Sequence, residues 1–148
     1  MIILTQKIHL ESNHQPNLTI FLTAEERTKI RQTIEIKEQN SDNITLLKLN
    51  LSRGEFLNTE DILSNDEGSF FVKIKAKLEP VITVKSDSKL NLLKAAYHLG
   101  NRHVSLEIGE HYLRFSPDHV LESMLMKLGL NIYEESAPFF PEFGAYKH

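Results

Sequence analysis

The fold of the second half is decided by residues 81–103, which read VITVKSDSKLNLLKAAYHLGNRH. The β-branched run from Val81 to Lys85 predicts a strand, and Ser86-Asp87-Ser88 supplies candidate N-caps for a helix directly after it. Apolar residues then recur at helical spacing, and Gly100 is the predicted C-terminal stop. These apolar positions are Leu90, Leu93, Ala96 and Tyr97. The stretch therefore predicts a strand followed by an amphipathic helix.

A hairpin and a second helix are predicted downstream. Val104 to Ile108 and His111 to Phe115 are short strand patterns, and Gly109-Glu110 is a two-residue connection between them. Ser116-Pro117 predicts a helix start with proline at the first helical position, and Gly129 predicts the end of that helix. The predicted buried stripe comprises Val120, Leu121, Met124, Leu125 and Leu128.

Asn131 to Glu134 adds a last predicted strand. The order β-α-β-β-α-β is that of a ferredoxin-like fold, in which both helices cover one face of a four-stranded antiparallel sheet. We therefore expect an α+β chain whose ferredoxin-like domain occupies residues 78–148.

Short strand patterns separated by turn residues fill residues 1–77. Thr23-Ala24-Glu25-Glu26 has capping-box spacing and predicts a short helix up to Ile30. The regular spacing of the strands predicts a small antiparallel barrel or sandwich. Because this region shows no catalytic constellation, we expect a scaffold or a domain that docks a partner or peptide. The strand patterns are Ile2 to Ile8, Leu18 to Leu22, Thr33 to Lys37, Ile44 to Leu51 and Phe70 to Leu78.

Composition excludes several classes of function. The chain has 148 residues, a formal net charge of -3 and no basic run, so a nucleic-acid partner is not expected. No apolar run reaches the roughly 18 residues that span a bilayer, and no basic segment precedes the apolar start, so we expect a cytoplasmic protein without a membrane partner. Cysteine is absent, which excludes disulfides, thiolate nucleophiles and iron–sulfur clusters. Any transition metal must therefore use nitrogen and oxygen ligands.

Histidine is concentrated in the second half of the chain. Imidazole titrates near neutral pH and binds borderline metals as a neutral ligand, so this enrichment makes metal handling the first hypothesis. Five of the seven histidines lie from residue 97 onward, namely His98, His103, His111, His119 and His148.

Three segments of the second half carry a resemblance to a known family. Ala96 to His103 reads AYHLGNRH, Asp118 to Leu125 reads DHVLESML, and Ala137 to Tyr146 reads APFFPEFGAY. In this order and at this spacing they resemble the UreE urease accessory proteins. The resemblance implies a homodimeric nickel metallochaperone with an N-terminal β domain and a C-terminal ferredoxin-like domain that binds metal. Its implied partners are a urease-maturation GTPase and the apo-urease complex, and its implied cargo is Ni²⁺, which Zn²⁺ or Cu²⁺ can replace in vitro.

The resemblance also suggests which histidines bind the ion. His103 matches the histidine that each subunit presents at the dimer interface, so that the pair holds one metal ion. His148 is a further candidate ligand, because a terminal residue can move toward the interface without strain. His119 and His98 are weaker candidates. For His119, Pro117 stands where some members of the family carry a second histidine. His98 can equally cap or pack in the last turn of its helix, where a positive charge interacts favourably with the helix dipole. Only Lys147-His148 follows Gly144-Ala145-Tyr146, where many members carry a histidine-rich tail, so few metals per dimer are expected.

Two other classes of function compete with this interpretation. An enzyme would need a nucleophile with an oriented base, or a metal with an activating carboxylate, and the sequence lacks the corresponding motifs. The other competitor is a non-metal adaptor or sensor that dimerises through its ferredoxin-like domain. Within metal biology, zinc or copper buffering is the alternative, because nitrogen donors alone prefer copper to nickel.

Overall fold

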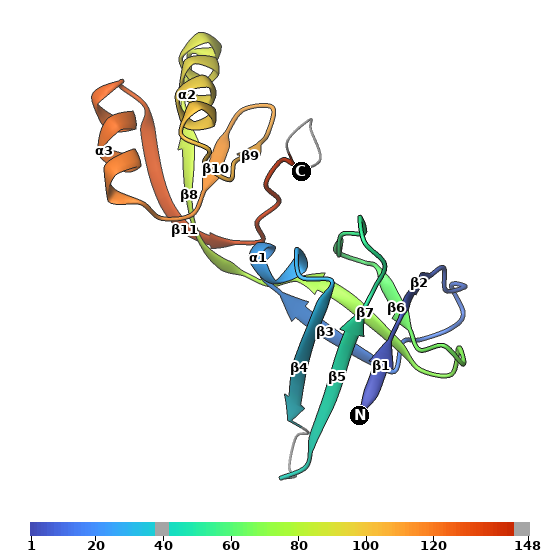
Figure 1. The fold of residues 1–148 in the computed structure, drawn as a ribbon. Helices are drawn as coiled ribbons and strands as arrows, with labels where there is room; N and C mark the ends of the chain where they lie inside the picture. The colour runs from blue at the N-terminus through green and yellow to red at the C-terminus, as the bar shows by residue number, and fades with distance from the viewer. Residues whose placement is uncertain (38–41, 144–148) are drawn as a thin grey trace. The chain divides into compact units, whose positions relative to one another are not determined.

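The computed structural model describes residues 1–37 and 42–143, and Figure 1 follows them along the chain. The chain forms two compact units that divide between Ala76 and Lys77. Each unit has its own cluster of buried apolar side chains. Among the helices described, none is long and apolar enough to cross a membrane.

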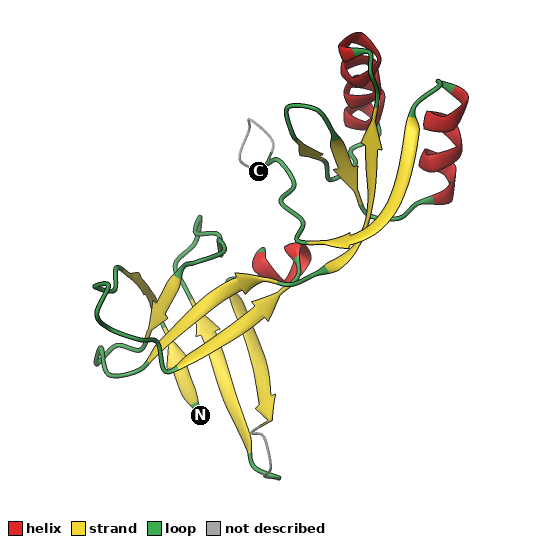
Figure 2. Cartoon of the chain, turned by 180° about the vertical axis from the view of Figure 1, so that it is seen from behind, coloured by secondary structure: helices red, strands yellow, loops and turns green. Residues whose placement is uncertain are grey.

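Two sheets and the short helix α1 (Ala24–Arg27) make up the first unit, whose strands Figure 2 draws in yellow. One sheet has the strand order β1-β5-β4, and the other has the order β2-β6-β7-β3. The strands are β1 (Ile2–Leu4), β2 (Gln6–Ile8), β3 (Leu18–Leu22), β4 (Arg31–Lys37), β5 (Ile44–Asn50), β6 (Ile62–Ser64) and β7 (Phe71–Ala76).

The first unit is a β-sandwich, but its strand directions are mixed rather than purely antiparallel as predicted. β1 pairs parallel with β5, and β3 pairs parallel with β7. The predicted strand Ile2 to Ile8 is in fact two strands, which flank Thr5 and join different sheets. A chain that changes sheets in this way places strands from distant parts of the sequence side by side, which allows parallel pairs. The three-residue strand β6 was not predicted.

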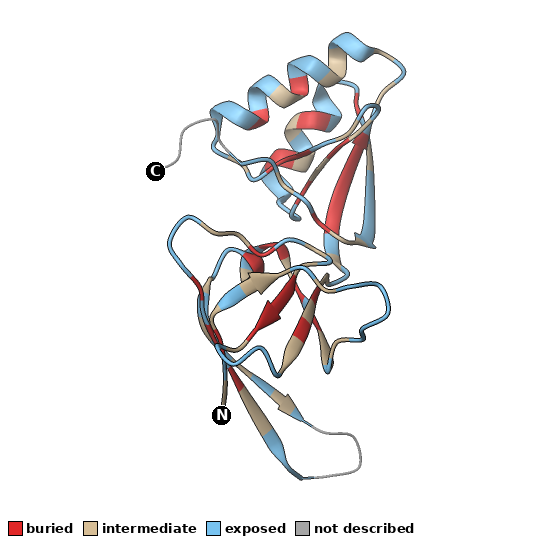
Figure 3. Ribbon diagram, turned by 90° about the vertical axis from the view of Figure 1, so that its right-hand side faces the viewer, coloured by how far each residue is buried: buried red, intermediate tan, exposed pale blue. Residues whose placement is uncertain are grey.

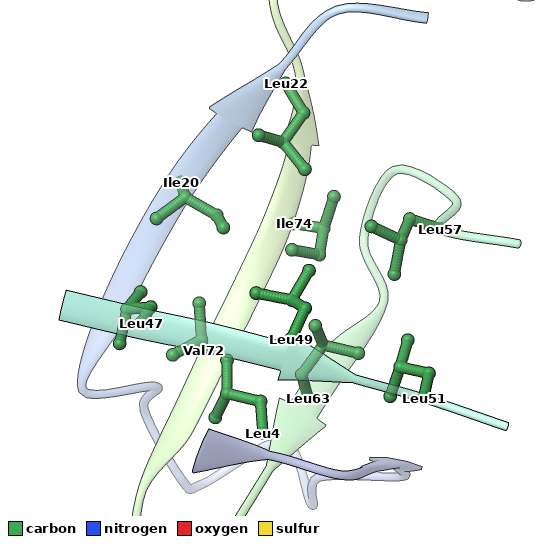
Figure 4. Close-up of a cluster of buried hydrophobic side chains, with 10 residues drawn as sticks. All are labelled: Leu4, Ile20, Leu22, Leu47, Leu49, Leu51, Leu57, Leu63, Val72 and Ile74. Carbon is green, nitrogen blue, oxygen red and sulfur yellow. The ribbon is translucent and has the colours of Figure 1, made fainter. Parts of the chain in front are cut away.

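One apolar core lies between the two sheets of this unit. Leu47 and Leu49 come from β5, and Val72 and Ile74 come from β7, and all four are fully buried. Each pair is spaced two residues apart, so both members face the same side of their strand. Figure 4 shows them in one cluster with residues of β1, β3 and β6. The two sheets therefore pack face to face.

The predicted capping box of α1 is confirmed. The Thr23 side chain accepts a hydrogen bond from the Glu26 amide at 3.2 Å, and the Glu26 carboxylate accepts one from the Thr23 amide at 2.9 Å. The helix ends at Arg27, before the predicted limit of Ile30.

The second unit is a ferredoxin-like domain, as predicted. Its sheet has the strand order β11-β8-β10-β9, and every neighbouring pair is antiparallel. This order results when two β-α-β crossovers interleave in one sheet. The elements are β8 (Glu79–Lys85), α2 (Lys89–Asn101), β9 (Glu107–Ile108), β10 (Leu113–Phe115), α3 (His119–Lys127) and β11 (Asn131–Ala137).

Both helices of this unit pack on the same face of its sheet. Val84 of β8 lies opposite Leu113 of β10, and Ile82 lies opposite Phe115. These four residues belong to one cluster with buried residues of α2 and α3. Thr83, between Ile82 and Val84, and Arg114, between Leu113 and Phe115, lie opposite one another and therefore face the other way. We call the side of the sheet that carries Thr83 and Arg114 the far face.

The buried side of α2 is not the side on which most of the apolar repeat of the sequence lies. Ala95 and Leu99 are fully buried, whereas Leu90, Leu93 and Tyr97 are 58%, 68% and 66% exposed. Figure 3 shows the narrow buried stripe beside a broad exposed surface on the helices. The predicted helix is confirmed, and Ala96 of the repeat packs partly buried against the core. The helix has apolar residues on two opposite sides, and periodicity alone does not say which side meets the sheet.

On α3 the predicted stripe is only partly confirmed. Leu121 and Leu125 are buried and Met124 is partly buried, but Val120 is 68% exposed and Leu128 is 45% exposed. The stripe is therefore narrower than predicted.

The helix ends of this unit follow local capping chemistry. Ser88 caps α2, within the predicted segment, and Gly129 ends α3 with a φ of +82°, as predicted. The N-cap of α3 is Asp118 rather than Ser116, because the Asp118 carboxylate accepts the Val120 and Leu121 amides at 3.0 and 3.1 Å. Strand β11 continues to Ala137, beyond the predicted limit of Glu134.

Candidate metal centre

His103 lies in the turn that ends α2. Its amide donates to the Gly100 carbonyl at 3.1 Å, and the Val104 amide donates to the Leu99 carbonyl at 3.3 Å. This pair of bonds is a Schellman motif, which requires a left-handed residue, and His103 has a φ of +56°. The helix therefore ends at Asn101, capped by Arg102 and the left-handed His103, and not at Gly100, which lies within α2.

The residue type at position 103 is unusual for this backbone conformation. Glycine is the usual residue in a left-handed helix cap because it has no Cβ, although histidine is found there more often than most residues. The His103 side chain is exposed. A strained position with an exposed imidazole indicates that the side chain serves a purpose other than ending the helix.

The structure places the other candidate histidines in different settings. His98 lies in the last turn of α2, where its ring packs edge-on against Tyr97 with ring centroids 5.5 Å apart. His119 is the first residue of α3 and lines a shallow hollow on that helix together with Val120 and Lys127. His111 lies in the β9–β10 connection, with its Nε2 3.9 Å from a carboxylate oxygen of Glu110. His148 lies outside the described residues.

Within the part of one chain that the structure describes, the histidines do not form a metal site. In residues 1–37 and 42–143, no three histidine or carboxylate side chains come together in a way that could hold a metal ion. His98, His103 and His119 therefore do not share a site in a single subunit.

An exposed apolar surface follows the outer side of α2. Leu90, Leu93 and Tyr97 are spaced three and four residues apart, so they lie on one side of the helix, opposite the buried Ala95 and Leu99. We call these three residues the outer α2 face. Apolar side chains clustered on the outside of a helix commonly mark a protein interface.

A network of polar side chains occupies the far face of the sheet. Arg114 lies opposite Glu107 of β9, and its guanidinium is 3.2 Å from that carboxylate. It also contacts Glu135 of β11 at 2.9 Å and the Thr83 hydroxyl at 3.0 Å. The guanidinium also lies 4.8 Å from the centre of the Tyr112 ring. Arg114 of β10 thereby contacts side chains from the other three strands of the sheet and from the β9–β10 connection.

The network changes the pKa of two of its members. The hydrogen bond that Tyr112 donates to Glu107, at 2.5 Å, raises the pKa of the tyrosine, and burial adds to this effect. The hydrogen bond from Thr83 to Glu135, followed by the charge of Arg114, lowers the pKa of the Glu135 carboxyl. At neutral pH, Tyr112 is therefore a protonated donor and Glu135 is an ionised acceptor.

The predicted hairpin residue Gly109 makes room for this arrangement. A Cβ added at Gly109 would lie 2.1 Å from a ring carbon of Tyr112. No side chain fits at position 109 unless the Tyr112 ring moves, and moving the ring would break its bond to Glu107.

Comparison with known proteins identifies the family. A family model described as "UreE urease accessory protein, C-terminal domain" matches residues 79–148. The urease accessory protein UreE of Microcystis aeruginosa is 49% identical over 143 residues, covering 95% of this chain and 87% of the relative. The chain belongs to the UreE family of urease accessory proteins. The UreE proteins of a Nostoc species and of Thermosynechococcus vestitus are 45% and 42% identical, with 100% and 99% of this chain covered and 97% and 98% of the relatives.

Family membership confirms the recognition made from the sequence motifs. It assigns the chain an accessory role in urease maturation, and it confirms that the chain is not itself an enzyme. His98, His103, His111, His119 and His148 all fall within the region that matches the UreE C-terminal domain.

Sequence reasoning missed the far-face network. The hairpin prediction placed Glu107 and Arg114 on adjacent strands, where opposite charges facing each other are a usable sign of a cross-strand pair. The sequence contains no comparable sign that Glu107 also contacts Phe140, which is 33 residues away.

Proposed function

We propose that this UreE family member is a nickel metallochaperone that works as a homodimer and delivers Ni²⁺ for assembly of the urease active site. In this proposal the two His103 imidazoles, one from each subunit, hold a single ion. His148 is a supplementary ligand, and His119 and His98 are weaker candidates. A urease-maturation GTPase and the apo-urease complex receive the ion in the cytoplasm, and residues 1–77 dock a partner.

The observation that carries the proposal is the exposed imidazole of His103 on a left-handed backbone. A histidine at a position that favours glycine is consistent with a ligand role. One imidazole is a poor site for nickel, but a two-fold axis doubles each donor without adding sequence. Such a site leaves coordination positions open, so the ion can be passed on.

The outer α2 face supports the homodimer. It offers three large exposed apolar side chains on α2, the helix that His103 directly follows in the C-terminal turn. A second copy packed there would remove this apolar surface from water. Leu93→Glu should therefore give monomers in sedimentation velocity, whereas the matched change Leu78→Glu, at a leucine that is 63% exposed elsewhere in the unit, should leave dimers. Dimers that persist in Leu93→Glu would exclude this face as the interface.

Equilibrium dialysis with nickel tests the ligand assignment. His103→Ala should abolish uptake, which we expect to be one ion per dimer. The matched control His111→Ala, which removes another exposed histidine of the same unit, should bind normally. Equal uptake by wild type and His103→Ala would favour the adaptor function. A competition of nickel with zinc and copper distinguishes delivery from zinc or copper buffering.

Metal uptake should also depend on pH. Ligating imidazoles must be neutral, so binding should weaken as the pH falls through about 6.5, where free imidazole side chains gain a proton. Dialysis at about pH 5 and about pH 7.5 measures this change. Uptake that is unchanged at the lower pH would argue against histidine ligands.

A further inference from the structure

Strand β4 forms an edge of the first unit. In the part of the chain that the structure describes, β4 pairs only with β5, and no strand pairs with its other side. Figures 1 and 2 show β4 at the border of this unit from opposite directions. With 7 residues, β4 is as long as its partner β5. We call the side of β4 that faces away from β5 the β4 edge.

The hydrogen-bond pattern shows which backbone groups point to the β4 edge. The Leu51 amide donates to the Ile30 carbonyl at 3.1 Å, and the register continues with Arg31 opposite Asn50. Bonded and non-bonded pairs alternate along an antiparallel ladder. Every second residue from Ile30 therefore bonds to β5, and the residues between them turn their amides and carbonyls toward the β4 edge. These residues are Arg31, Thr33, Glu35 and Lys37.

The β4 edge lacks the features that commonly protect an edge strand. Such features include a proline, a bulge or a charged side chain on the covered side of the sheet. β4 contains no proline, and its register with β5 is continuous. On the core-facing side, Ile34 and Ile36 pack against the core, and the Gln32 side chain donates to the carbonyls of Glu26 and Lys29. A strand added at the β4 edge would therefore extend the sheet without burying a charge of β4.

Charge on the outer side of β4 indicates the chemistry of a partner. Arg31 and Lys37 are exposed there, and the exposed Lys48 of β5 lies opposite Thr33 on the same side. Within the described residues, none of these three cations forms an ion pair. Glu35 is the one carboxylate on this side of the two strands. The outer side is thus positive although the chain has a net charge of -3, and acidic residues beside Arg31 and Lys37 would be stabilised.

We propose that the β4 edge binds an extended segment of a partner protein as an added strand, and that apolar and acidic residues alternate in this segment. Its apolar side chains cover Ile34 and Ile36, and its acidic side chains lie beside Arg31 and Lys37. Its backbone bonds to the groups of β4 that point away from β5. In strand addition, backbone bonds supply affinity and the alternating side chains supply specificity.

This inference rests on the proposed function, because it names the surface by which residues 1–77 dock a partner. It makes no use of nickel or of His103.

Synthetic peptides as long as β4 test the proposal on the full, isotope-labelled chain by nuclear magnetic resonance titration. The probe is acetyl-EVTITVE-amide, which reads the same in both directions and has valine and isoleucine on one side of a strand. The matched control acetyl-VETITEV-amide has the same composition but carries its glutamates on the core-facing side. The control should bind at least about tenfold more weakly, because it places two carboxylates against Ile34 and Ile36.

Hydrogen exchange in the presence of the probe tests strand addition directly. The probe should slow exchange of the amides that point to the β4 edge, and it should leave those of Gln32, Ile34 and Ile36 unchanged, because they already bond to β5. Binding that protects none of the edge amides would overturn strand addition. The edge amides are those of Arg31, Thr33, Glu35 and Lys37.

A backbone variant removes one of these amides. Thr33→Pro deletes an amide that points to the β4 edge and no bond to β5, and proline is tolerated at such positions of edge strands. It should weaken probe binding about three- to tenfold, since one intermolecular hydrogen bond is lost. The matched change Thr33→Val keeps the amide and should bind the probe normally. Equal probe binding by the two variants would overturn the β4 edge as the docking site.

A charge swap leaves the backbone untouched and decides the question if Thr33→Pro fails to fold. The double change of Arg31→Glu and Lys37→Glu should reverse the preference, so that acetyl-KVTITVK-amide binds more tightly than the probe. The control Arg53→Glu, at an exposed cation outside both sheets, should keep the wild-type preference. An unchanged preference in the double variant would overturn the charge assignment.

Two further outcomes would also overturn the inference. Edge amides that become protected without peptide as the protein concentration rises would mean that a second copy of the chain occupies the β4 edge. A wild-type chain that binds none of the peptides would mean that the edge takes no added strand. In either case nickel uptake by wild type and His103→Ala would still decide the metal-binding part of the proposed function, so the two ideas fail separately.

Discussion

The left-handed backbone of His103 allows two roles of this residue to be tested separately. One is the role of its imidazole, and the other is its role in ending α2. With a φ of +56°, any residue that carries a Cβ is strained there, and glycine is not. His103→Gly and His103→Ala both lack the imidazole, so both should lose nickel. His103→Gly should nevertheless be more stable than His103→Ala by about 1 kcal/mol. Urea denaturation of the two metal-free variants measures this difference, and a more stable alanine variant would contradict the assigned turn.

Glu135 should make stability depend on pH. Its hydrogen bond with Thr83 and the charge of Arg114 lower its pKa below the ordinary value of 4.5. A carboxyl whose pKa is lower in the folded state stabilises the fold above that ordinary value, and the effect is lost as the pH falls through the folded value. Glu135→Gln should cost at most about 1 kcal/mol near neutral pH, since the side chain is 43% exposed.

Urea denaturation of wild type and Glu135→Gln, near neutral pH and in acid, measures this dependence. The two midpoints should differ near neutral pH and converge in acid. A gap that does not change with pH would mean that the side chain contributes through packing and not through its charge.

At the level of single elements, the start of α3 gives a direct stability test. Asp118 accepts two amides of the first turn, whereas Ser116 lies outside the helix. Asp118→Ala should therefore cost about 1 kcal/mol of unfolding free energy. Ser116→Ala, at the N-cap expected from sequence, should be close to neutral. Thermal melts of both variants provide the comparison, and the reverse order of stability would restore Ser116 as the cap.

The elements of the second unit show what sequence patterns can predict. Strand and helix order followed from local signals such as Ser88 and Gly129, which act within one turn of chain. The buried side of α2 did not follow, because Leu93 and Leu99 are equally apolar and only the sheet decides which of them is covered. The start of α3 was misplaced because serine before proline and aspartate before histidine are both good N-cap sequences.

The candidate metal centre could be predicted from the sequence only in part. Motif resemblance drew attention to His103 and its neighbours, and their role as ligands stays a prediction. The left-handed conformation of His103 was not foreseen, because Gly100 offered a more obvious end to the helix. The contact between Glu107 and Phe140 could not be predicted either, since it joins residues 33 apart through a side chain and a backbone amide.

On the scale of the whole molecule, the chain has two separate hydrophobic cores, and each is formed by different elements. One core joins the two sheets of the first unit and includes Leu49, and the other joins α2, α3 and the ferredoxin-like sheet and includes Leu125. Both leucines are fully buried. The chain therefore has two separate sources of apolar stabilisation, as expected for two cooperative units.

Truncating either leucine should destabilise mainly its own unit. Leu49→Ala and Leu125→Ala should each cost about 2–5 kcal/mol, since they remove buried methyl groups and leave a cavity. Native-state hydrogen exchange on the full chain resolves where the loss occurs. Leu49→Ala should speed exchange of the buried strands within residues 1–76, and Leu125→Ala should do so within residues 77–143. Equal acceleration in both units from either variant would mean that the two cores unfold together.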